Sequence, residues 1–127
     1  MNAESRGVAL RMVIVDDSSH FLDAARNLLQ HDGVDVVGVA STSAEAIPLV
    51  SEVRPDVVLV DVDLGEESGF DLVRILAGCG KFRVVLISAY PESELADLIA
   101  ASPADGFVSK SELSASAVVR LLGYERG

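Results

Sequence analysis

Five short runs of aliphatic, mostly β-branched residues recur at regular intervals, and they constrain the possible fold more than any other feature of this sequence. The runs are 12–15, 34–40, 57–60, 84–87 and 106–108. Apart from Asp35, they are not interrupted by charged residues. Uninterrupted apolar strands of this length are typical of parallel sheets, in which helices cover both faces. We therefore predict five strands in one parallel sheet.

The segments between and after these runs have the apolar spacing of amphipathic helices. The first helix can be capped by Ser18 or Ser19. The second opens at Thr42, with Glu45 at the spacing of a capping box, and Pro48 is expected to bend or shorten it. The expected inward positions of the five helices are Phe21, Leu22, Ala25, Leu28 and Leu29, then Ala46, Ile47, Leu49, Val50 and Val53, then Phe70, Val73, Leu76 and Ala77, then Leu95, Leu98 and Ile99, and finally Leu113, Ala117, Arg120 and Leu121.

Turn-forming residues bracket the last three helices. Gly69 opens the third helix and Gly78 can stop it, and Pro91 suits the first turn of the fourth. Ser111 or Ser114 opens the fifth. Strand and helix therefore alternate five times, which predicts one α/β domain with right-handed crossovers and helices on both faces of the sheet.

Charge and composition exclude several classes of partner. The chain carries 20 acidic against 10 basic residues, a net charge of −10. Such a surface repels nucleic acid phosphates and anionic membranes, so we expect no direct nucleic acid or membrane binding. No apolar run approaches the ~18 residues of a membrane span, and residues 1–11 do not read as a signal peptide. Cys79 is the only cysteine, so no intrachain disulfide is possible, and we expect a cytoplasmic protein.

Polar side chains follow four of the five runs at the point where each strand is expected to end. Because the carboxyl ends of parallel strands meet at one edge of the sheet, these side chains are expected to converge. Each of them alone is also explained by a turn, a helix cap or a solvated surface position. The combination is more specific than its parts. Its members are Asp16, Asp17, Asp61, Asp63, Ser88 and Lys110.

This set of side chains suits phosphoryl transfer. Neighbouring carboxylates need raised pKa values or a bound cation, and an all-oxygen site favours Mg²⁺ or Ca²⁺. Lys110 supplies a second positive charge for a phosphate, and Ser88 supplies a hydroxyl donor. Positioning and charge neutralisation are what phosphoryl transfer requires. Asp61, in the middle of the set, is the expected attacking carboxylate.

Four segments carry a resemblance to a known family: VIVDDS (13–18), VLVDVDLGEESGFDL (58–72), VLISAY (85–90) and DGFVSK (105–110). They resemble the receiver domain of two-component response regulators. The resemblance implies a flavodoxin-like, doubly wound five-stranded sheet of order 2-1-3-4-5 with five helices. It covers residues 11–122, which leaves 1–10 as an N-terminal extension and 123–127 as a C-terminal tail.

The resemblance also implies roles for the site residues. Asp61 would be the phosphoacceptor, with Mg²⁺ bound by Asp61, by Asp17, and by Asp16 either directly or through water. The backbone carbonyl of Asp63 would be a further ligand. Lys110 would pair with a phosphoryl oxygen, and Ser88 would hydrogen-bond the phosphate after activation.

Three further positions follow from the resemblance. Phe107 would turn its ring inward as Ser88 moves, although an ordinary core aromatic explains this residue too. Asp63 and Tyr90 would border the path of an attacking water and modulate phosphoryl lifetime. Many receivers have proline where this chain has Gly65 and Ser111, so the loop at Gly65 is expected to be freer.

The family's partners are expected here as well. A sensor histidine kinase or a phosphotransfer protein of a phosphorelay would supply the phosphoryl group. The surface of the fourth helix, fifth strand and fifth helix would signal to an output domain or a downstream protein, or form a homodimer. The chain would not be an enzyme beyond assisting its own phosphorylation and dephosphorylation.

Two other functions remain open at this stage. The Asp61-Val62-Asp63 spacing imitates a haloacid-dehalogenase-type phosphatase, although in that family the pair normally follows the first strand. Alternatively, the chain is an interaction module that keeps the fold but works without phosphorylation.

Overall fold

All five predicted strands are present and form one parallel sheet. A computed structural model describes residues 9–124 of the chain. Its sheet runs in the order β3-β2-β4-β7-β8, and every neighbouring pair is parallel. Counting only these strands along the chain, the order is 2-1-3-4-5, which confirms the predicted fold class. The strands are β2 (Arg11–Val15), β3 (Asp35–Ala40), β4 (Val57–Asp61), β7 (Arg83–Ser88) and β8 (Gly106–Ser109).

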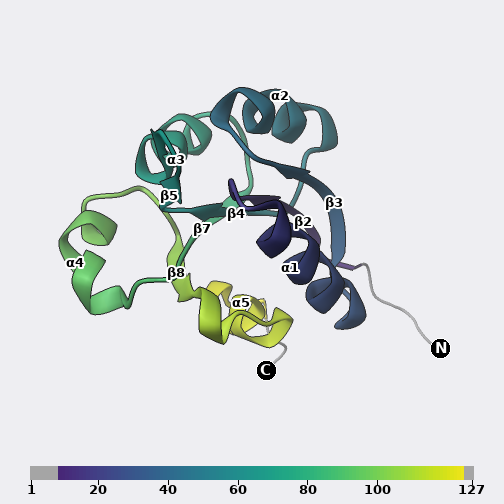
Figure 1. The fold of residues 1–127 in the computed structure, drawn as a ribbon. Coiled ribbons are helices and arrows are strands. Elements are labelled where there is room, and N and C mark those ends of the chain that lie inside the picture. Colours follow the sequence, from purple (N-terminus) through teal and green to yellow (C-terminus); the bar gives the residue numbers. More distant parts are fainter. Residues whose placement is uncertain (1–8, 125–127) are drawn as a thin grey trace.

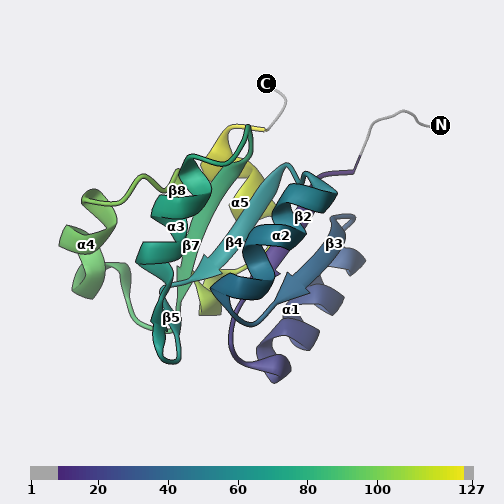
Figure 2. The same cartoon turned by 90° about the horizontal axis from the view of Figure 1, so that it is seen from above.

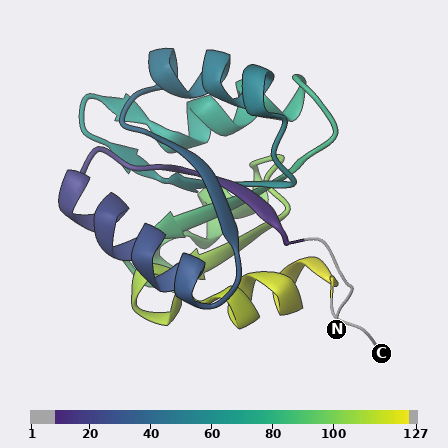
Figure 3. The same cartoon turned by 90° about the vertical axis from the view of Figure 1, so that its right-hand side faces the viewer.

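Helices cover both faces of the sheet. Figure 1 shows α1 and α5 below it and α2 and α3 above it, and Figure 3 shows the same layers from the side. Helix α4 lies beyond the edge formed by β8 (Figure 2). The five helices are α1 (Ser19–His31), α2 (Ser43–Val53), α3 (Gly69–Ala77), α4 (Glu92–Ala100) and α5 (Ala115–Leu122). Residues 1–8 and 125–127, which make up most of the predicted extension and tail, lie outside the described residues.

The sheet separates two apolar cores. Successive strand residues point to opposite faces, so each strand contributes to both cores. On the side of α2 and α3, Val58 and Val60 of β4 pack with Leu72 and Leu76 of α3. On the other side, Leu59 packs among residues of α1 and α5. A strand buried on both faces has no polar positions until it ends, and this is why the predicted site residues lie at the strand ends.

The helix starts follow the predicted caps closely. The Ser18 and Thr42 hydroxyls accept backbone N–H groups from Phe21 and Glu45, each at 3.2 Å. The Glu45 carboxylate accepts from Ser41 N–H rather than from the cap residue itself. Pro48 does not end α2, which continues to Val53.

The fifth helix starts later than one of the two predicted positions. It is capped by Ser114, whose hydroxyl accepts from Ala117 N–H at 3.0 Å. Ser111 lies instead in a short 3₁₀ turn, η1 (Lys110–Glu112).

Several predicted inward positions were wrong. Leu28, Leu98 and Leu121 are 44%, 53% and 40% exposed. Helix α1 does bury Leu29, as predicted, whereas α5 buries Val118 and Leu122, which were not among the predicted positions. Helix α4 has no buried residue because it contacts the sheet only at its edge. Ala77 and Arg120, also predicted inward, are exposed.

A small hairpin between β4 and α3 was not predicted. Strands β5 (Asp63–Leu64) and β6 (Glu67–Ser68) pair antiparallel around Gly65 and Glu66. Gly65 has φ +76°. Glu66 has negative φ, because Arg54 is the one non-glycine residue among 9–124 whose φ is positive. This combination is the one that a type II′ turn requires. Proline, fixed near φ −65°, cannot take the place of Gly65 in this turn.

Candidate functional site

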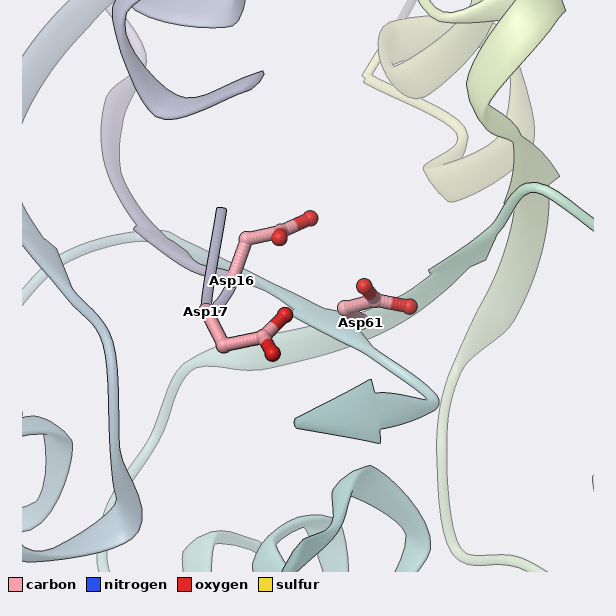
Figure 4. A group of neighbouring side chains, drawn as sticks. All are labelled: Asp16, Asp17 and Asp61. Atoms are coloured by element: carbon pink, nitrogen blue, oxygen red, sulfur yellow. The ribbon is translucent and has the colours of Figure 1, made fainter. Parts of the chain in front are cut away.

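Three carboxyl groups meet at the carboxyl ends of β2 and β4. Asp16, Asp17 and Asp61 each offer one oxygen atom, and these three atoms lie within 4.8 Å of one another. Figure 4 shows the three side chains grouped beside the ends of the two strands. The first two directly follow β2, and Asp61 is the last residue of the neighbouring strand β4. The parallel pairing of the two strands therefore brings the acids together.

Asp16 is completely buried and is held from two sides. Its backbone N–H donates to the Ala40 carbonyl at 3.0 Å, which continues the pairing of β2 with β3. Its Oδ1 atom accepts from the Ser18 backbone N–H at 2.9 Å. Its Oδ2 atom is buried and accepts no hydrogen bond of good geometry. A buried carboxylate oxygen needs a positively charged or hydrogen-bonding partner, and an ammonium group or a bound cation can supply it.

Asp17 and Asp61 differ in exposure. The Asp17 side chain faces solvent, whereas Asp61 is 5% exposed. Asp61 Oδ1 accepts from the Asp63 N–H at 3.2 Å, and Oδ2 accepts from the Lys110 ammonium at 3.0 Å. The Asp61 carboxylate is thus held at both oxygens, while the Asp17 carboxylate is open to solvent.

Lys110 reaches this cluster from the end of β8. Its Nζ atom lies 2.6 Å from Asp16 Oδ2 and 3.0 Å from Asp61 Oδ2. The shorter contact is an ion pair that lacks hydrogen-bond direction, which is why Asp16 Oδ2 lacks a good hydrogen bond. Nζ also lies 4.2 Å from the centroid of the Phe21 ring. One ammonium group is therefore shared by two carboxylates and an aromatic face.

Burial and the neighbouring charged groups shift two pKa values at the site. Burial raises the pKa of Asp61 to about 6. The Asp63 N–H and Lys110 oppose this rise, and the charge of Asp16 adds to it. Burial alone would lower the pKa of Lys110, but its contacts with Asp16 and Asp61 outweigh burial and raise it. Both pKa values are therefore raised. Lys110 faces two carboxylates, which favour its charged form, whereas Asp61 has to share the Lys110 ammonium with Asp16.

A pocket of about 240 Å³ opens above these groups. Ser88 is buried at the end of β7, and its hydroxyl accepts from the Tyr90 N–H at 3.0 Å. Tyr90 is 56% exposed at the rim. The exposed Asp63 carboxylate accepts from the Gly65 N–H at 3.1 Å. The pocket is lined by Asp16, Asp17, Ser18, Asp61, Asp63, Ser88, Ala89, Tyr90 and Lys110.

Phe107 lies apart from this pocket but on the same face of the sheet as Ser88. It pairs with Leu86 in the neighbouring strand, and Ser88 is two residues farther along that strand. The alternation of side chains therefore points Ser88 and Phe107 the same way. Phe107 is 9% exposed and borders a separate groove of about 490 Å³ beside α4 and α5. Its predicted motion stays a prediction.

Phe21 is the contact at this site that the sequence reasoning missed. The helical pattern assigned it to the apolar face of α1, and it does pack partly against the core there. Its position over Lys110 depends on how far α1 lies from the end of β8 across the sheet. No local pattern in the sequence carries that information.

The three carboxylates fit a hard divalent cation. Mg²⁺ prefers six oxygen ligands at about 2.1 Å in octahedral geometry, which places neighbouring ligand atoms about 3 Å apart and opposite ones about 4 Å apart. One oxygen from each of the three acids can be brought into such a shell with small movements, given their present separations. The described residues that line the pocket offer carboxylate and hydroxyl oxygens and no His or Cys ligand. The donor set therefore suits Mg²⁺ better than zinc or copper.

Residues 9–124 contain no helix that is both long and apolar enough to cross a membrane.

Comparison with known proteins gives one consistent result. Residues 12–121 match the family model described as the response regulator receiver domain. A protein-glutamate methylesterase/protein-glutamine glutaminase of Myxococcus xanthus is 36% identical over 93% of this chain. A similar protein of Koribacter versatilis is 30% identical over 67% of the chain. The chain spans 34% and 24% of the lengths of these two relatives.

A solved structure resembles the whole fold. The two-component response regulator of the LuxR family from Aurantimonas is 26% identical, with a TM-score of 0.77. The match covers 94% of this chain and 89% of that chain.

Proposed function

Because this chain belongs to the response regulator receiver domain family, we propose that it accepts a phosphoryl group on Asp61 and uses the modified state as a signal. The observation that carries this proposal is the position of Asp61. Its buried carboxylate lies beside a lysine ammonium, within a cluster of acids that suits Mg²⁺. Phosphoryl transfer needs little else from a protein than such positioning and charge neutralisation.

The proposed transfer is an in-line displacement. An oxygen of Asp61 forms a bond to phosphorus, and the bond from phosphorus to the donor breaks. The donor's imidazole nitrogen or carboxylate oxygen leaves with the electron pair. Lys110 remains protonated, since its contacts raise its pKa, and it can donate to a phosphoryl oxygen.

We assign Mg²⁺ to Asp16, Asp17, Asp61 and the backbone carbonyl of Asp63. When bound, the ion neutralises charge on the phosphoryl oxygens and offsets the repulsion among the acids. Asp17 is exposed and provides the entry side, whereas Asp16 is fixed by the Ser18 N–H. Asp63 and Tyr90, at the rim of the pocket, are assigned to the control of phosphoryl lifetime.

Signalling follows from Ser88 and Phe107. The Ser88 hydroxyl now accepts from Tyr90 N–H, and its own proton is free to be donated to a phosphoryl oxygen. Movement of Ser88 toward Asp61 would open space on the face where Phe107 lies. An inward turn of that ring would reshape the groove beside α4 and α5. This is a local charge change acting on a packing element with two states.

The surface of α4, β8 and α5 is accordingly assigned to signal output. A sensor histidine kinase or a phosphotransfer protein of a phosphorelay would deliver the phosphoryl group. The recipient of the signal would be an output domain, a downstream protein or a second copy of the chain. We place this signalling in the cytoplasm, in a receiver domain spanning residues 11–122, with no catalytic activity beyond its own phosphorylation and dephosphorylation.

The decisive experiment is labelling with acetyl phosphate or a phosphorylated histidine donor. We expect wild-type protein to be labelled in Mg²⁺ and not in excess chelator, and Asp61→Asn to remain unlabelled. Asp97→Asn, an exposed acid on α4, serves as the control and should be labelled normally. Equal labelling of Asp61→Asn and wild type would refute the assignment.

Assays of phosphomonoester turnover and of Mg²⁺ binding, run beside the labelling, separate the two other candidate functions. Steady turnover of a phosphomonoester would indicate a haloacid-dehalogenase-type phosphatase. Its second acid would have to act beside Asp61, whereas the Asp63 carboxylate is exposed and accepts from Gly65 N–H. Absence of both labelling and Mg²⁺ binding would instead indicate an interaction module that works without phosphate.

A further inference from the structure

Lys110 has one neighbour at the site that is neither charged nor a hydrogen-bond acceptor of the usual kind. Its Nζ atom lies 4.2 Å from the ring centroid of Phe21, in the first turn of α1. An ammonium group within about 6 Å of an aromatic face is attracted by the negative charge density of the ring. The Lys110 side chain is 19% exposed, so this attraction is partly shielded from water.

The three contacts of this ammonium group respond differently to the proposed chemistry. A cation bound at Asp16 competes with the ion pair at its Oδ2 atom, now 2.6 Å from Nζ. A phosphoryl group on Asp61 changes the carboxylate that now lies 3.0 Å from Nζ. The ring of Phe21 coordinates no metal and receives no phosphoryl group. Of the three contacts, only this one is left unchanged through the cycle.

We propose that Phe21 is a positioning residue whose ring face holds the Lys110 ammonium in the pocket when the two carboxylates are engaged elsewhere. This inference rests on the proposed phosphoryl transfer at Asp61. The ring would limit the freedom of a long side chain and leave its N–H donors directed at an incoming phosphoryl oxygen. Loss of the ring would weaken binding of the phosphoryl group without removing any ligand of the metal.

Packing alone also gives Phe21 a structural role. The residue is partly buried against the core formed with α1 and α5. A simple substitution such as Phe21→Leu therefore changes both packing and electrostatics. The test has to alter the charge density of the ring while keeping its shape.

Fluorinated phenylalanines placed at position 21 meet this requirement. Mono-, di- and trifluorophenylalanine keep nearly the same volume and progressively weaken the attraction of a cation to the ring. The measurement is the affinity of the full chain for beryllofluoride, a phosphoryl mimic, in the presence of Mg²⁺. We expect affinity to fall stepwise across the series, by about 2- to 5-fold in total. An equal affinity across the series would overturn the proposal.

A second measurement needs neither metal nor phosphate. The ε-methylene protons of Lys110 should show an upfield ring-current shift in the NMR spectrum of the metal-free wild type. Phe21→Leu should abolish this shift, and Phe21→Trp should retain it. Phe82→Leu is the matched control, because Phe82 packs against the other core. An unchanged Lys110 shift in Phe21→Leu would contradict the contact.

The two measurements distinguish failure of the inference from failure of the proposed function. If wild type binds beryllofluoride and fluorination of residue 21 leaves the affinity unchanged, Asp61 remains the proposed phosphoacceptor. Phe21 then has no part in positioning Lys110. If wild type fails to bind beryllofluoride at all, the proposed function fails. The Lys110 shift then decides by itself whether the ring holds the ammonium.

Discussion

The surroundings of Asp61 disfavour the charged form of its carboxyl group. Its carboxylate is buried beside the fully buried Asp16, and the single ammonium of Lys110 is divided between the two acids. The pKa of Asp61 is raised to about 6, chiefly by burial. Binding of a cation would reduce the repulsion among these buried carboxylates. The fold, by burying them together, therefore favours the cation binding that the proposed chemistry requires.

The raised pKa of Asp61 predicts a pH-dependent gain in stability for Asp61→Asn. Between its ordinary value of 3.8 and about 6, the folded state binds more protons than the unfolded state. The free energy of unfolding of wild type therefore falls as pH rises through this window. Asp61→Asn lacks this loss, so in metal-free protein it should be more stable above pH 6, by about 1–3 kcal/mol. The two proteins should be equal near pH 4.

Urea unfolding in chelator across this pH range is the measurement. Asp105→Asn is not a suitable control, because that carboxylate accepts from the Val84 N–H and pairs with Arg83. The exposed Asp97 is better, and Asp97→Asn should show no comparable trend. A constant difference between Asp61→Asn and wild type at all pH values would contradict the assignment of the shift to Asp61.

Gly69 is the residue on which the placement of Asp61 depends most directly. A Cβ atom at this position would overlap the carbonyl oxygen of Asp61 and lie 2.7 Å from its carbonyl carbon. Backbone atoms cannot move aside as a flexible side chain can. Gly69→Ala should therefore lower the free energy of unfolding by about 1–3 kcal/mol and slow labelling of Asp61.

The matched control for this prediction is at the other end of the same helix. A Cβ atom at Gly78 would meet nothing closer than the Ile75 carbonyl oxygen, at 3.8 Å. Gly78→Ala should leave labelling unchanged. Chemical unfolding and acetyl phosphate labelling of both variants check the expectation. Wild-type labelling by Gly69→Ala would show that the Asp61 backbone does not require glycine here.

At the scale of elements, α4 is the least anchored helix described. None of its residues is buried, its N-cap Pro91 makes no side-chain cap hydrogen bond, and Leu98 is 53% exposed. Few buried contacts mean a small free energy of local opening. Amide hydrogens of α4 should exchange faster than those of α1, which buries three residues.

Hydrogen exchange of the unmodified and beryllofluoride-bound forms measures this difference. If α4 belongs to the output surface, binding should change its exchange more than that of α1. Equal protection of α4 and α1 in the unmodified form would contradict the interpretation of α4 as loosely held.

The elements also show how far local sequence patterns can predict structure. Strands were predicted to within one or two residues because an apolar run buried on both faces has a sharp beginning and end. Which side of a helix faces inward was harder to predict. Leu28 and Leu121 have helical spacing, yet both are exposed, while their neighbours Leu29 and Leu122 are buried. The β5–β6 hairpin was missed because it rests on two-residue strands and one turn.

For the candidate site, too, some features could be predicted from the sequence and others could not. Asp16, Asp17, Asp61 and Lys110 were expected together because parallel topology alone brings their strand ends to one edge. Their separations and the burial of Asp16 needed the structure. The contact of Phe21 with Lys110 depends on the lateral position of α1, which no strand end determines.

For the whole molecule, which carries a net charge of −10, cation binding is expected to raise the free energy of unfolding as well as to support the proposed phosphoryl transfer. The acids at the ends of β2 and β4 concentrate part of this charge in one place, within 4.8 Å. A ligand that binds only the folded state stabilises it by mass action. Mg²⁺ at a hundred times its dissociation constant should raise the free energy of unfolding by about 2.7 kcal/mol.

This stabilisation should depend on the site and not on general screening of the negative surface. Asp17 is exposed, so Asp17→Asn should fold normally yet lose most of the increase in Tm that Mg²⁺ gives wild type. Asp97→Asn removes the same charge from α4 and should keep the increase. Thermal unfolding in Mg²⁺ and in NaCl of equal ionic strength separates the two effects, because screening acts on all three proteins alike. An equal Mg²⁺ response in Asp17→Asn and wild type would mean that the ion acts on the surface charge as a whole, and that the acids of β2 and β4 do not form its site.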